Sequence, residues 1–313
     1  MSISANQNWR FLGFELCPDN SLQWSQSYAQ MPTATKLDDD TLLVLYATRD
    51  AENRSRIGSM TLSLPDFSLQ TQAVQPSLEL GKLGAFDDSG VMPSSLIWVA
   101  GKLYLYYVGW NRAVDVPYHN SIGLAVSEDN GRTFTRAFQG PIIDRSAVEP
   151  YFCGTCCVRR FRNEWICWYM SCNGWKLVGD KPEPYYDIKR AVSADGMFWS
   201  RTGLPSLAAL SQDEAISRVT IHKSDNVMHL WFSARPVSGY RQECASLSQI
   251  GYARSADGKI WDRLSNKVSF QSELESNSAH SYPEVISWNN RLFMLYNGDN
   301  FGQQGFRIAE LTD

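Results

Sequence analysis

The stretch Ile122–Phe134, IGLAVSEDNGRTF, returns twice in altered form along the chain. Its copies are IKRAVSADGMFW over Ile188–Trp199 and IGYARSADGKIW over Ile250–Trp261. The aspartates of the three copies, at positions 129, 195 and 257, are 66 and 62 residues apart. Self-similarity at such a period is typical of repeat architectures, in which each unit of secondary structure packs on the next. A functional site is therefore expected where the repeats meet.

Each copy lies inside a unit of four predicted strands. Around Asp129, alternating aromatic and aliphatic residues predict strands over Ser94–Val99 and Gly101–Val108, and two more follow over Ile122–Ser127 and Thr133–Phe138. In the next unit the third strand is predicted over 187–193. Four consecutive antiparallel strands form a meander, which is one blade of a β-propeller.

The same frame fits five times along the 313 residues. We therefore predict an all-β fold, a single five-bladed β-propeller domain over residues 1–313, with four-stranded antiparallel blades at approximately 28–80, 88–144, 148–210, 213–275 and 280–313. The last unit is one strand short. Residues 8–16, which include Trp9–Leu16, are predicted to pair with it and close the ring, because closure removes sheet edges that would otherwise aggregate.

The three aspartates of the repeat are predicted to be structural. Asp hydrogen-bonds nearby backbone in a tight turn, and the Gly beside it accepts positive φ. Asp129, Asp195 and Asp257 recur because each unit needs a turn, and the Trp or Phe that follows is expected to pack between blades.

Composition narrows the classes of function. Hydrophobic residues make up 43%, charged residues 20%, and the net charge is −4, which is unlike the basic footprint of a nucleic-acid-binding protein. No apolar run is long enough for a membrane span, and the polar segment Met1–Arg10 does not resemble a signal peptide, so a cytoplasmic protein is expected. Aromatic residues make up 12%, including 11 Trp, which suits stacking on sugar rings as well as filling a β core.

The cysteines are predicted to be reduced and buried. Their number, seven, is odd, and the cluster Cys153-Gly154-Thr155-Cys156-Cys157 is not followed by a second pair of the kind that a structural zinc needs. We therefore expect no metal and no cofactor.

Carboxylates recur at the predicted starts of the innermost strands, where a propeller gathers one segment from every blade into a funnel. The segments are 28–33, 87–93, 148–152, 213–218 and 280–284. Cleavage of a glycosidic bond needs two carboxyl groups, one to protonate the leaving oxygen and one to act as nucleophile or base. The carboxylates of these segments, among them Glu149, Glu214 and Asp88, are therefore candidates for the catalytic acids.

The chain resembles the five-bladed β-propeller glycosidase superfamily of arabinanases and xylosidases, invertases and levansucrases, and β-mannoside phosphorylases. The resemblance rests on the five units, on the turns over Ser193–Trp199 and Ser255–Trp261, and on the acids at blade starts. It implies that Glu149, a Glu rather than an Asp, matches the carboxylate at the start of the third blade, and that Glu214 matches the general acid at the start of the fourth.

The first blade departs from this placement of acids at the starts of blades. Its start, Gln30–Thr33, has no carboxylate, and the aspartates at 38–40 lie at the far hairpin of that strand. Asp87 or Asp88 of the second blade would then supply the missing acid. Alternatively the acceptor is phosphate, which needs cations instead of a base, and the candidates for holding it are Arg145, Arg218, Arg235 and His280.

Further polar and aromatic residues at the predicted funnel are candidates for binding a carbohydrate substrate. Sugar hydroxyls are held by stacking and by Asn, Asp and Arg hydrogen bonds. The predicted substrate-binding residues are Asp87, Trp110, Asn111, Trp175, Arg218, Arg235, His280, Tyr282, Asn297 and Asp299.

The sequence thus favours a glycoside-active enzyme, a hydrolase or phosphorylase acting on carbohydrate, and leaves the oligomeric state open. Two alternatives stay open: a non-catalytic carbohydrate-binding propeller, and a sugar transferase or lyase of polysaccharide biosynthesis. Two funnel carboxyls about 5–10 Å apart would support glycosidase chemistry. Funnel acids that are all paired with arginine would support a binding module.

Overall fold

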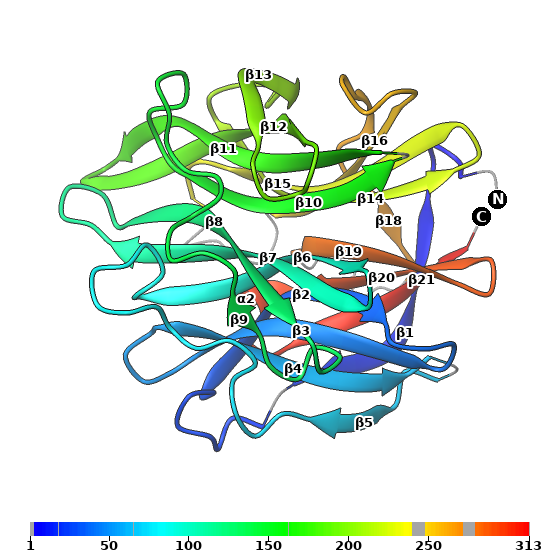
Figure 1. Ribbon diagram of the computed structural model, residues 1–313. Coiled ribbons are helices and arrows are strands. Elements are labelled where there is room, and N and C mark those ends of the chain that lie inside the picture. The colour runs from blue at the N-terminus through cyan, green and yellow to red at the C-terminus, as the bar shows by residue number, and fades with distance from the viewer. Residues whose placement is uncertain are drawn as a thin grey trace.

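The computed structural model describes residues 3–17, 19–64, 66–161, 163–239, 248–271 and 279–312, without the side chains of Phe14 and Asp299. The described chain is nearly all β, as predicted, with a short helical segment α2 at Asp299–Gly302 (Figure 1). No described helix is long and apolar enough to cross a membrane.

Two sheets of the described chain are four-stranded antiparallel meanders. Their strands are β10 (Cys153–Phe161), β11 (Glu164–Val178), β12 (Lys181–Ser193) and β13 (Ser200–Leu207), and β14 (Glu214–Ser224), β15 (Val227–Pro236), β16 (Gln249–Ser255) and β17 (Asp262–Ser265). Both follow the order of strands predicted from the repeat.

A third sheet combines two such meanders. Its strands are β2 (Ser27–Lys36), β3 (Thr41–Arg49), β4 (Ser55–Ser63) and β5 (Leu69–Gln72), then β6 (Gly90–Val99), β7 (Lys102–Arg112), β8 (Tyr118–Ser127) and β9 (Thr135–Arg136). The two halves are joined by one pair, Ser55 with Gly90. The outer strand β9 has two residues, where a strand over Thr133–Phe138 was predicted.

The last sheet joins the two ends of the chain. It contains β18 (Ser269–Phe270), β1 (Asn8–Leu16), β21 (Phe306–Thr312), β20 (Arg291–Asn297) and β19 (Ser281–Trp288) in that spatial order. Strand β1 is antiparallel to β21, and Figure 1 shows the termini side by side. The prediction that Trp9–Leu16 pairs with the last unit is confirmed.

The first strands of the meanders contact one another in a cycle. Strand β2 contacts β6, β6 contacts β10, β10 contacts β14, β14 contacts β19, and β19 contacts β2 again. The sheets are therefore arranged around one axis, which the inner strands enclose.

Arg218 fills the region that these inner strands enclose. It lies on β14, is 0% exposed, and donates hydrogen bonds to the backbone carbonyls of Pro32, Pro93 and Pro283 on three other inner strands. Its guanidinium also pairs with Glu284 of β19 at 2.9 Å. The structure thus gives Arg218 a role in holding the inner strands together rather than in binding substrate, because its donors are already satisfied inside the core.

The aspartates of the repeat form turns, as predicted. The carboxylate of Asp195 accepts hydrogen bonds from Ser193 and from the backbone N–H of Met197 and Phe198. These backbone hydrogen bonds hold the pKa of Asp195 below its ordinary value. Asp129 and Asp257 make the corresponding bonds to Ser127 and Ser255.

The turns at Asp195 and Asp257 also pack on the preceding meander. The hydroxyl of Tyr106 donates to the carbonyl of Gly196, and the indole of Trp168 donates to the carbonyl of Gly258. Trp261, just after the third turn, lies edge-on to Trp168 with ring centroids 6.0 Å apart. The repeated motif therefore supplies contacts between sheets as well as turns within them.

Five of the cysteines lie buried in β10 and β11: Cys153, Cys156, Cys157, Cys167 and Cys172. Burial raises the pKa of the thiols of Cys153 and Cys172 to about 12, so these thiols stay protonated. Among the described residues, no group of three or more His, Cys, Asp or Glu side chains is placed to hold a metal ion.

Candidate functional site

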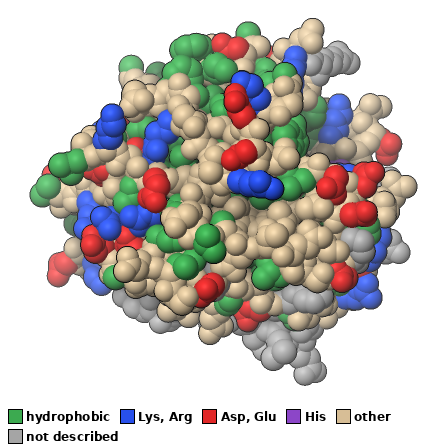
Figure 2. Space-filling view, turned by 60° about the horizontal axis from the view of Figure 1, so that its bottom comes forward, with side chains coloured by type: hydrophobic (Ala, Val, Ile, Leu, Met, Phe, Trp, Pro, Cys, Tyr) green, Lys and Arg blue, Asp and Glu red, His purple; other side chains and the backbone are tan. Residues whose placement is uncertain are grey.

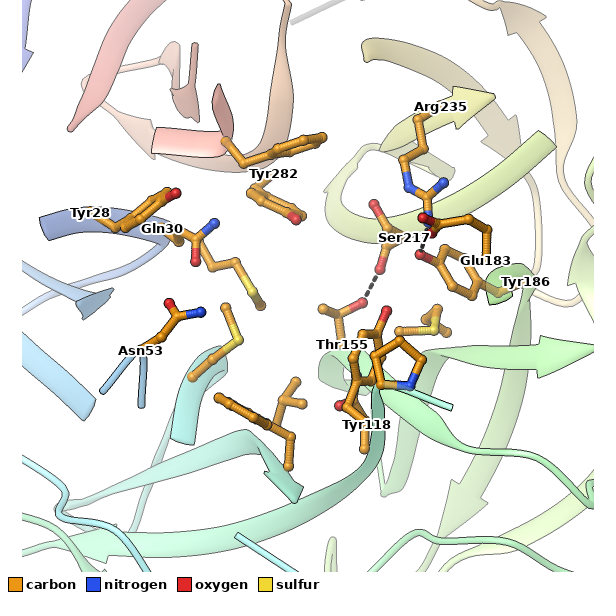
Figure 3. Close-up of a pocket in the computed structure, with 18 of the residues that line it drawn as sticks. Tyr28, Gln30, Asn53, Tyr118, Thr155, Glu183, Tyr186, Ser217, Arg235 and Tyr282 are labelled. Atoms are coloured by element: carbon orange, nitrogen blue, oxygen red, sulfur yellow. Dashed lines mark hydrogen bonds between the residues drawn. The ribbon is translucent and has the colours of Figure 1, made fainter. Parts of the chain in front are cut away.

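A cavity of about 770 Å³ lies at the starting ends of the inner strands, where the sequence predicted a funnel. Every inner strand contributes to it: Gln30 from β2, Met92 from β6, Thr155 from β10, Ser217 from β14 and Tyr282 from β19. Figure 3 shows these strands around the cavity, with the labelled side chains pointing inward. Residues far apart in the sequence therefore form one site.

The lining is aromatic and polar. Rings and amides suited to sugar faces and hydroxyls come from Tyr28, Gln30, Asn53, Trp110, Tyr118, Asn120, Tyr186, Tyr282, Asn300 and Phe301. Six lining residues have positive φ, among them Tyr28, Met31, Tyr282 and Phe301. Such backbone strain in bulky residues persists only where surrounding structure enforces it, and it gathers at functional sites.

One wall of the cavity is a hairpin that projects beyond its sheet. Strand β12 begins at Lys181, six residues before the predicted start at Asp187, and pairs with β11 through a tight turn at Gly179, whose φ is 61°. A bulge between Cys172 and Gly174 separates the projecting part from the rest. The projection brings Lys181, Pro182, Glu183 and Tyr186 to the cavity.

Aromatic packing supports this hairpin from behind. Trp175 lies against Phe152 and Tyr118, with ring centroids 5.5 and 5.7 Å away, and Phe152 also contacts Tyr186. Trp175 was predicted to bind substrate. It packs behind the lining instead, where its large apolar ring fixes the wall in place.

Glu183 is the one carboxylate among the described residues that line the cavity. Its residue is 5% exposed, and in Figure 3 its side chain lies beside those of Arg235 and Tyr186. Arg235 donates to the Tyr186 hydroxyl at 2.5 Å and stacks over the Tyr186 ring at 5.4 Å. The arrangement places an acid, a cation and a phenol together on one wall.

Cations outnumber the carboxylate in this lining. Arg49, Arg112, Lys181 and Arg235 all contribute to the cavity. On the face drawn in Figure 2, Lys and Arg side chains are interspersed with Asp and Glu side chains. The described lining of the cavity, by contrast, contains four cations and one carboxylate.

No family model matches the chain. The uncharacterized proteins Rv1502 and MT1551 from two strains of Mycobacterium tuberculosis are each 32% identical to it over 309 residues, covering 97% of this chain and 99% of theirs. The chain belongs to the Rv1502 family. The match runs over nearly the whole length of both proteins.

Solved structures show the same fold in this Rv1502-family chain and in β-propeller glycosidases. A protein described as a glycoside hydrolase superposes with a TM-score of 0.72 at 16% identity, over 96% of this chain and 90% of that one. A structure from work on mannoside phosphorylases of family GH130 gives 0.71 at 13%, over 100% and 96%. The α-L-arabinofuranosidase PaAbf62A of Podospora anserina gives 0.68 at 12%, over 99% and 98%.

Three of the predicted substrate-binding residues of this Rv1502-family chain line the cavity. They are Trp110, Arg235 and Tyr282. Trp110 is oriented by a hydrogen bond of 2.8 Å from its indole N–H to the hydroxyl of Ser55. Asn111, its neighbour on β7, pairs with His119 of β8 and does not line the cavity.

Glu149 lies behind the cavity lining, enclosed by its own meander. It is 1% exposed and accepts hydrogen bonds from the hydroxyls of Tyr169 and Ser171. Arg201 and Lys189 pair with it at 3.1 and 3.5 Å. These partners neutralise and fix the carboxylate, so the geometry gives it a structural role instead of the predicted catalytic one.

Glu214 also lies outside the lining, in an ion pair. Both of its carboxylate oxygens accept from Arg263, at 2.5 and 2.9 Å. Burial raises its pKa, but the hydrogen bonds from Arg263 and from the backbone N–H of Leu210 lower it more, so the pKa is below its ordinary value. A general acid needs the opposite shift.

The predicted acids of the second unit hold loops. Asp87 is 1% exposed, accepts from the hydroxyl of Tyr107 and pairs with Arg136 at 2.8 Å. Asp88 accepts from the backbone N–H of Gly84. Neither aspartate lines the cavity.

The remaining predictions concern the last unit. His280 is 1% exposed and stacks on Phe270 with centroids 4.2 Å apart, outside the lining. Asn297 accepts from the N–H of Met31 and donates to the carbonyls of Ala29 and Gly305, so it holds the start of β2, which does line the cavity. The side chain of Asp299 lies outside the described residues.

Glu183 was not among the predicted site residues. It sits in the sequence Lys181-Pro182-Glu183-Pro184, which reads as a loop, because proline interrupts strand pairing. A signal was present in the carboxylate between two prolines, followed directly by two tyrosines.

Proposed function

We propose that this protein acts on a glycosidic bond in the cavity, with Glu183 as the acid that protonates the leaving oxygen. The observation that carries the proposal is the position of Glu183, a buried carboxylate in a cavity lined by rings and amides. Proton donation by a positioned carboxyl group is the step that glycoside cleavage requires.

The fold supports this assignment at the level of reaction class. The structures that share it are described as a glycoside hydrolase, as an arabinofuranosidase bound to cellotriose, and in a study of mannoside phosphorylases. The cavity volume of about 770 Å³ lies in the range typical of small-molecule sites, and is sufficient for a short oligosaccharide.

Phosphate is the acceptor that the lining favours. Hydrolysis uses two carboxylates, one of them to activate water, and the described lining has one. Phosphate is already an anionic nucleophile, so it needs cations to hold it and no base. Arg235 and Lys181 lie on the same wall as Glu183 and are the residues we assign to that task.

A binding protein without turnover is the second candidate. It is favoured by the ion pairs of Glu149 with Arg201 and of Glu214 with Arg263, since acids neutralised by arginine were the sign expected of a binding module. In that case the cavity would still hold a sugar.

We also infer a five-bladed propeller. The cycle of contacts among β2, β6, β10, β14 and β19 supports it, and so does the division of the eight-stranded sheet into two meanders at the single Ser55–Gly90 pair. The sheets then correspond to the blade ranges predicted from the repeat.

An NMR-monitored turnover screen tests the function. α- and β-linked glycosides would be incubated with the protein, with and without phosphate, beside Glu183→Gln and the control Glu128→Gln, whose surface carboxylate pairs with Lys102. Turnover should fall by about 10²-fold or more in Glu183→Gln and stay unchanged in the control. Dependence on phosphate would support phosphorolysis.

Two results would count against parts of this proposal. Full turnover by Glu183→Gln would remove Glu183 from the mechanism. Silence over the whole panel, with line broadening of one sugar, would favour the binding protein.

A further inference from the structure

We propose that Arg49 and its neighbours form a site for an anionic group carried by the sugar ligand, a carboxylate or a phosphate. The inference rests on the carbohydrate cavity proposed above and specifies the class of sugar that it accepts. Figure 3 places Gln30 and Asn53, the partners of Arg49, across the cavity from Glu183. The anionic group would thus lie away from the reacting bond.

The guanidinium of Arg49 is held in place by neutral groups. Two of its nitrogens donate to the side-chain oxygen of Gln30, at 3.2 and 3.3 Å, and a third donates to the carbonyl and the side-chain oxygen of Asn53 at 3.2 and 3.1 Å. Its carbon lies 5.5 Å from the centroid of the Tyr28 ring. The residues Tyr28, Gln30, Arg49 and Asn53 all line the cavity.

Arg49 has no carboxylate partner among the described residues. The neighbouring Asp50 is occupied by Arg54 and Arg56, at 2.9 and 2.7 Å, and Glu52 pairs with Arg54. A half-buried cation without a countercharge is costly, and burial lowers the pKa of this guanidinium from its ordinary value. An anionic ligand supplies the missing charge through charge-assisted hydrogen bonds.

A second guanidinium reinforces the site. Arg112, at the end of β7, donates to the carbonyl of Glu52, next to the Asn53 carbonyl that accepts from Arg49. Arg112 also lines the cavity and makes no ion pair with the described residues. Two arginines anchored to consecutive carbonyls therefore face one space, and their summed field attracts an anion.

Binding measured without turnover tests the site. Titration calorimetry on the intact protein would compare glucose, glucuronic acid, glucose 1-phosphate and inorganic phosphate. The variants are Arg49→Gln, Arg49→Lys and the control Arg132→Gln, whose exposed guanidinium lies in the Asp129 turn. Thermal unfolding of each variant checks that it is folded, and salt dependence of wild-type binding gives a readout that needs no variant.

The acidic ligands should bind the wild type more tightly than glucose does. Added salt should weaken the binding of the acidic ligands and leave the binding of glucose unchanged. Arg49→Gln should weaken the acidic ligands by about tenfold or more, Arg49→Lys should retain part of the affinity, and Arg132→Gln should have no effect. Binding of glucuronic acid identifies a sugar carboxylate, and binding of glucose 1-phosphate but not inorganic phosphate identifies a sugar phosphate. Inorganic phosphate binding alone, with the same dependence on Arg49, would overturn the proposal that the anionic group is carried by the sugar.

Equal affinity for glucose and the acidic ligands, or no binding of any acidic ligand, would overturn the anion site. Failure of the anion site can be distinguished from failure of the proposed reaction. Turnover of neutral glycosides without binding of an acidic ligand would support the proposed function and contradict the anion site. Arg49-dependent binding of an acidic ligand without turnover would support the anion site and contradict the proposed function.

Discussion

Glu149 and Glu183 are both buried carboxylates, and their surroundings differ. Glu149 is enclosed by two hydroxyls, a lysine and an arginine of its own meander. Glu183 lies on a projecting wall and faces the cavity. Burial and residue type are the same, so what separates the two carboxylates is their position, since Glu183 lines the cavity and Glu149 lies behind its lining.

The ion pair of Glu214 predicts a dependence of stability on pH. Because the folded pKa is lower than the unfolded value of about 4.3, the pair stabilises the protein above that pH, and the contribution is lost as pH falls through the folded pKa. Glu214→Gln should lower the melting temperature at pH 7 and lower it much less near pH 3. Thermal unfolding at both pH values measures this, and an equal loss at both would contradict the assignment.

At the scale of elements, the repeat and the hairpin β11–β12 differ in how far the sequence reveals them. The repeated turns were predictable because their bonds join residues two to four positions apart, as between Ser193 and Asp195. The extension of β12 was not, because Pro182 and Pro184 argue against pairing, and packing of Trp175 against Phe152 overrides that local preference.

The turn at Gly258 predicts a packing effect on stability. A Cβ added there would lie 2.7 Å from the ring of Trp168, whereas one at Gly101, which has a similar φ of +79°, meets no atom within 4 Å. Gly101→Ala therefore loses stability through backbone strain alone. Gly258→Ala adds a steric clash, so its free energy of unfolding should fall by about 1–3 kcal/mol more. Denaturant unfolding of the two variants gives the difference, and equal losses would mean that the turn does not pack as described.

At the scale of the molecule, the meanders are held together by contacts among their inner strands. Arg218 connects β14 to β2, β6 and β19 through carbonyls and through Glu284. Burial raises the pKa of Glu284 even beside this arginine. The site residues share this long-range character, since Arg49, Glu183 and Tyr282 meet only when separate sheets assemble. The sequence therefore predicted the sheets and the place of the cavity, but not the partners that neutralise Glu149 or satisfy Arg218.

Removing the central guanidinium should destabilise the whole protein. Arg218→Met leaves several carbonyls unsatisfied and a buried carboxylate unpaired, so we expect a loss of about 3–5 kcal/mol in the free energy of unfolding. Adding Glu284→Gln removes the unpaired charge and should recover part of that loss. Denaturant unfolding of both variants measures it, and a stable single variant would show that Arg218 does not hold the inner strands.

The pairing of β1 with β21 has a consequence for synthesis on the ribosome. At ordinary elongation rates, strand β1 is made roughly 15–60 s before its antiparallel partner β21, because nearly 300 residues separate the two. Until then the edge of β1 that pairs with β21 is open to other chains, and the loop that must close spans the residues between Leu16 and Phe306. Pairing of β1 with β21 thus waits on translation of the residues between them, and a nascent-chain chaperone would be of most use to this protein in that interval.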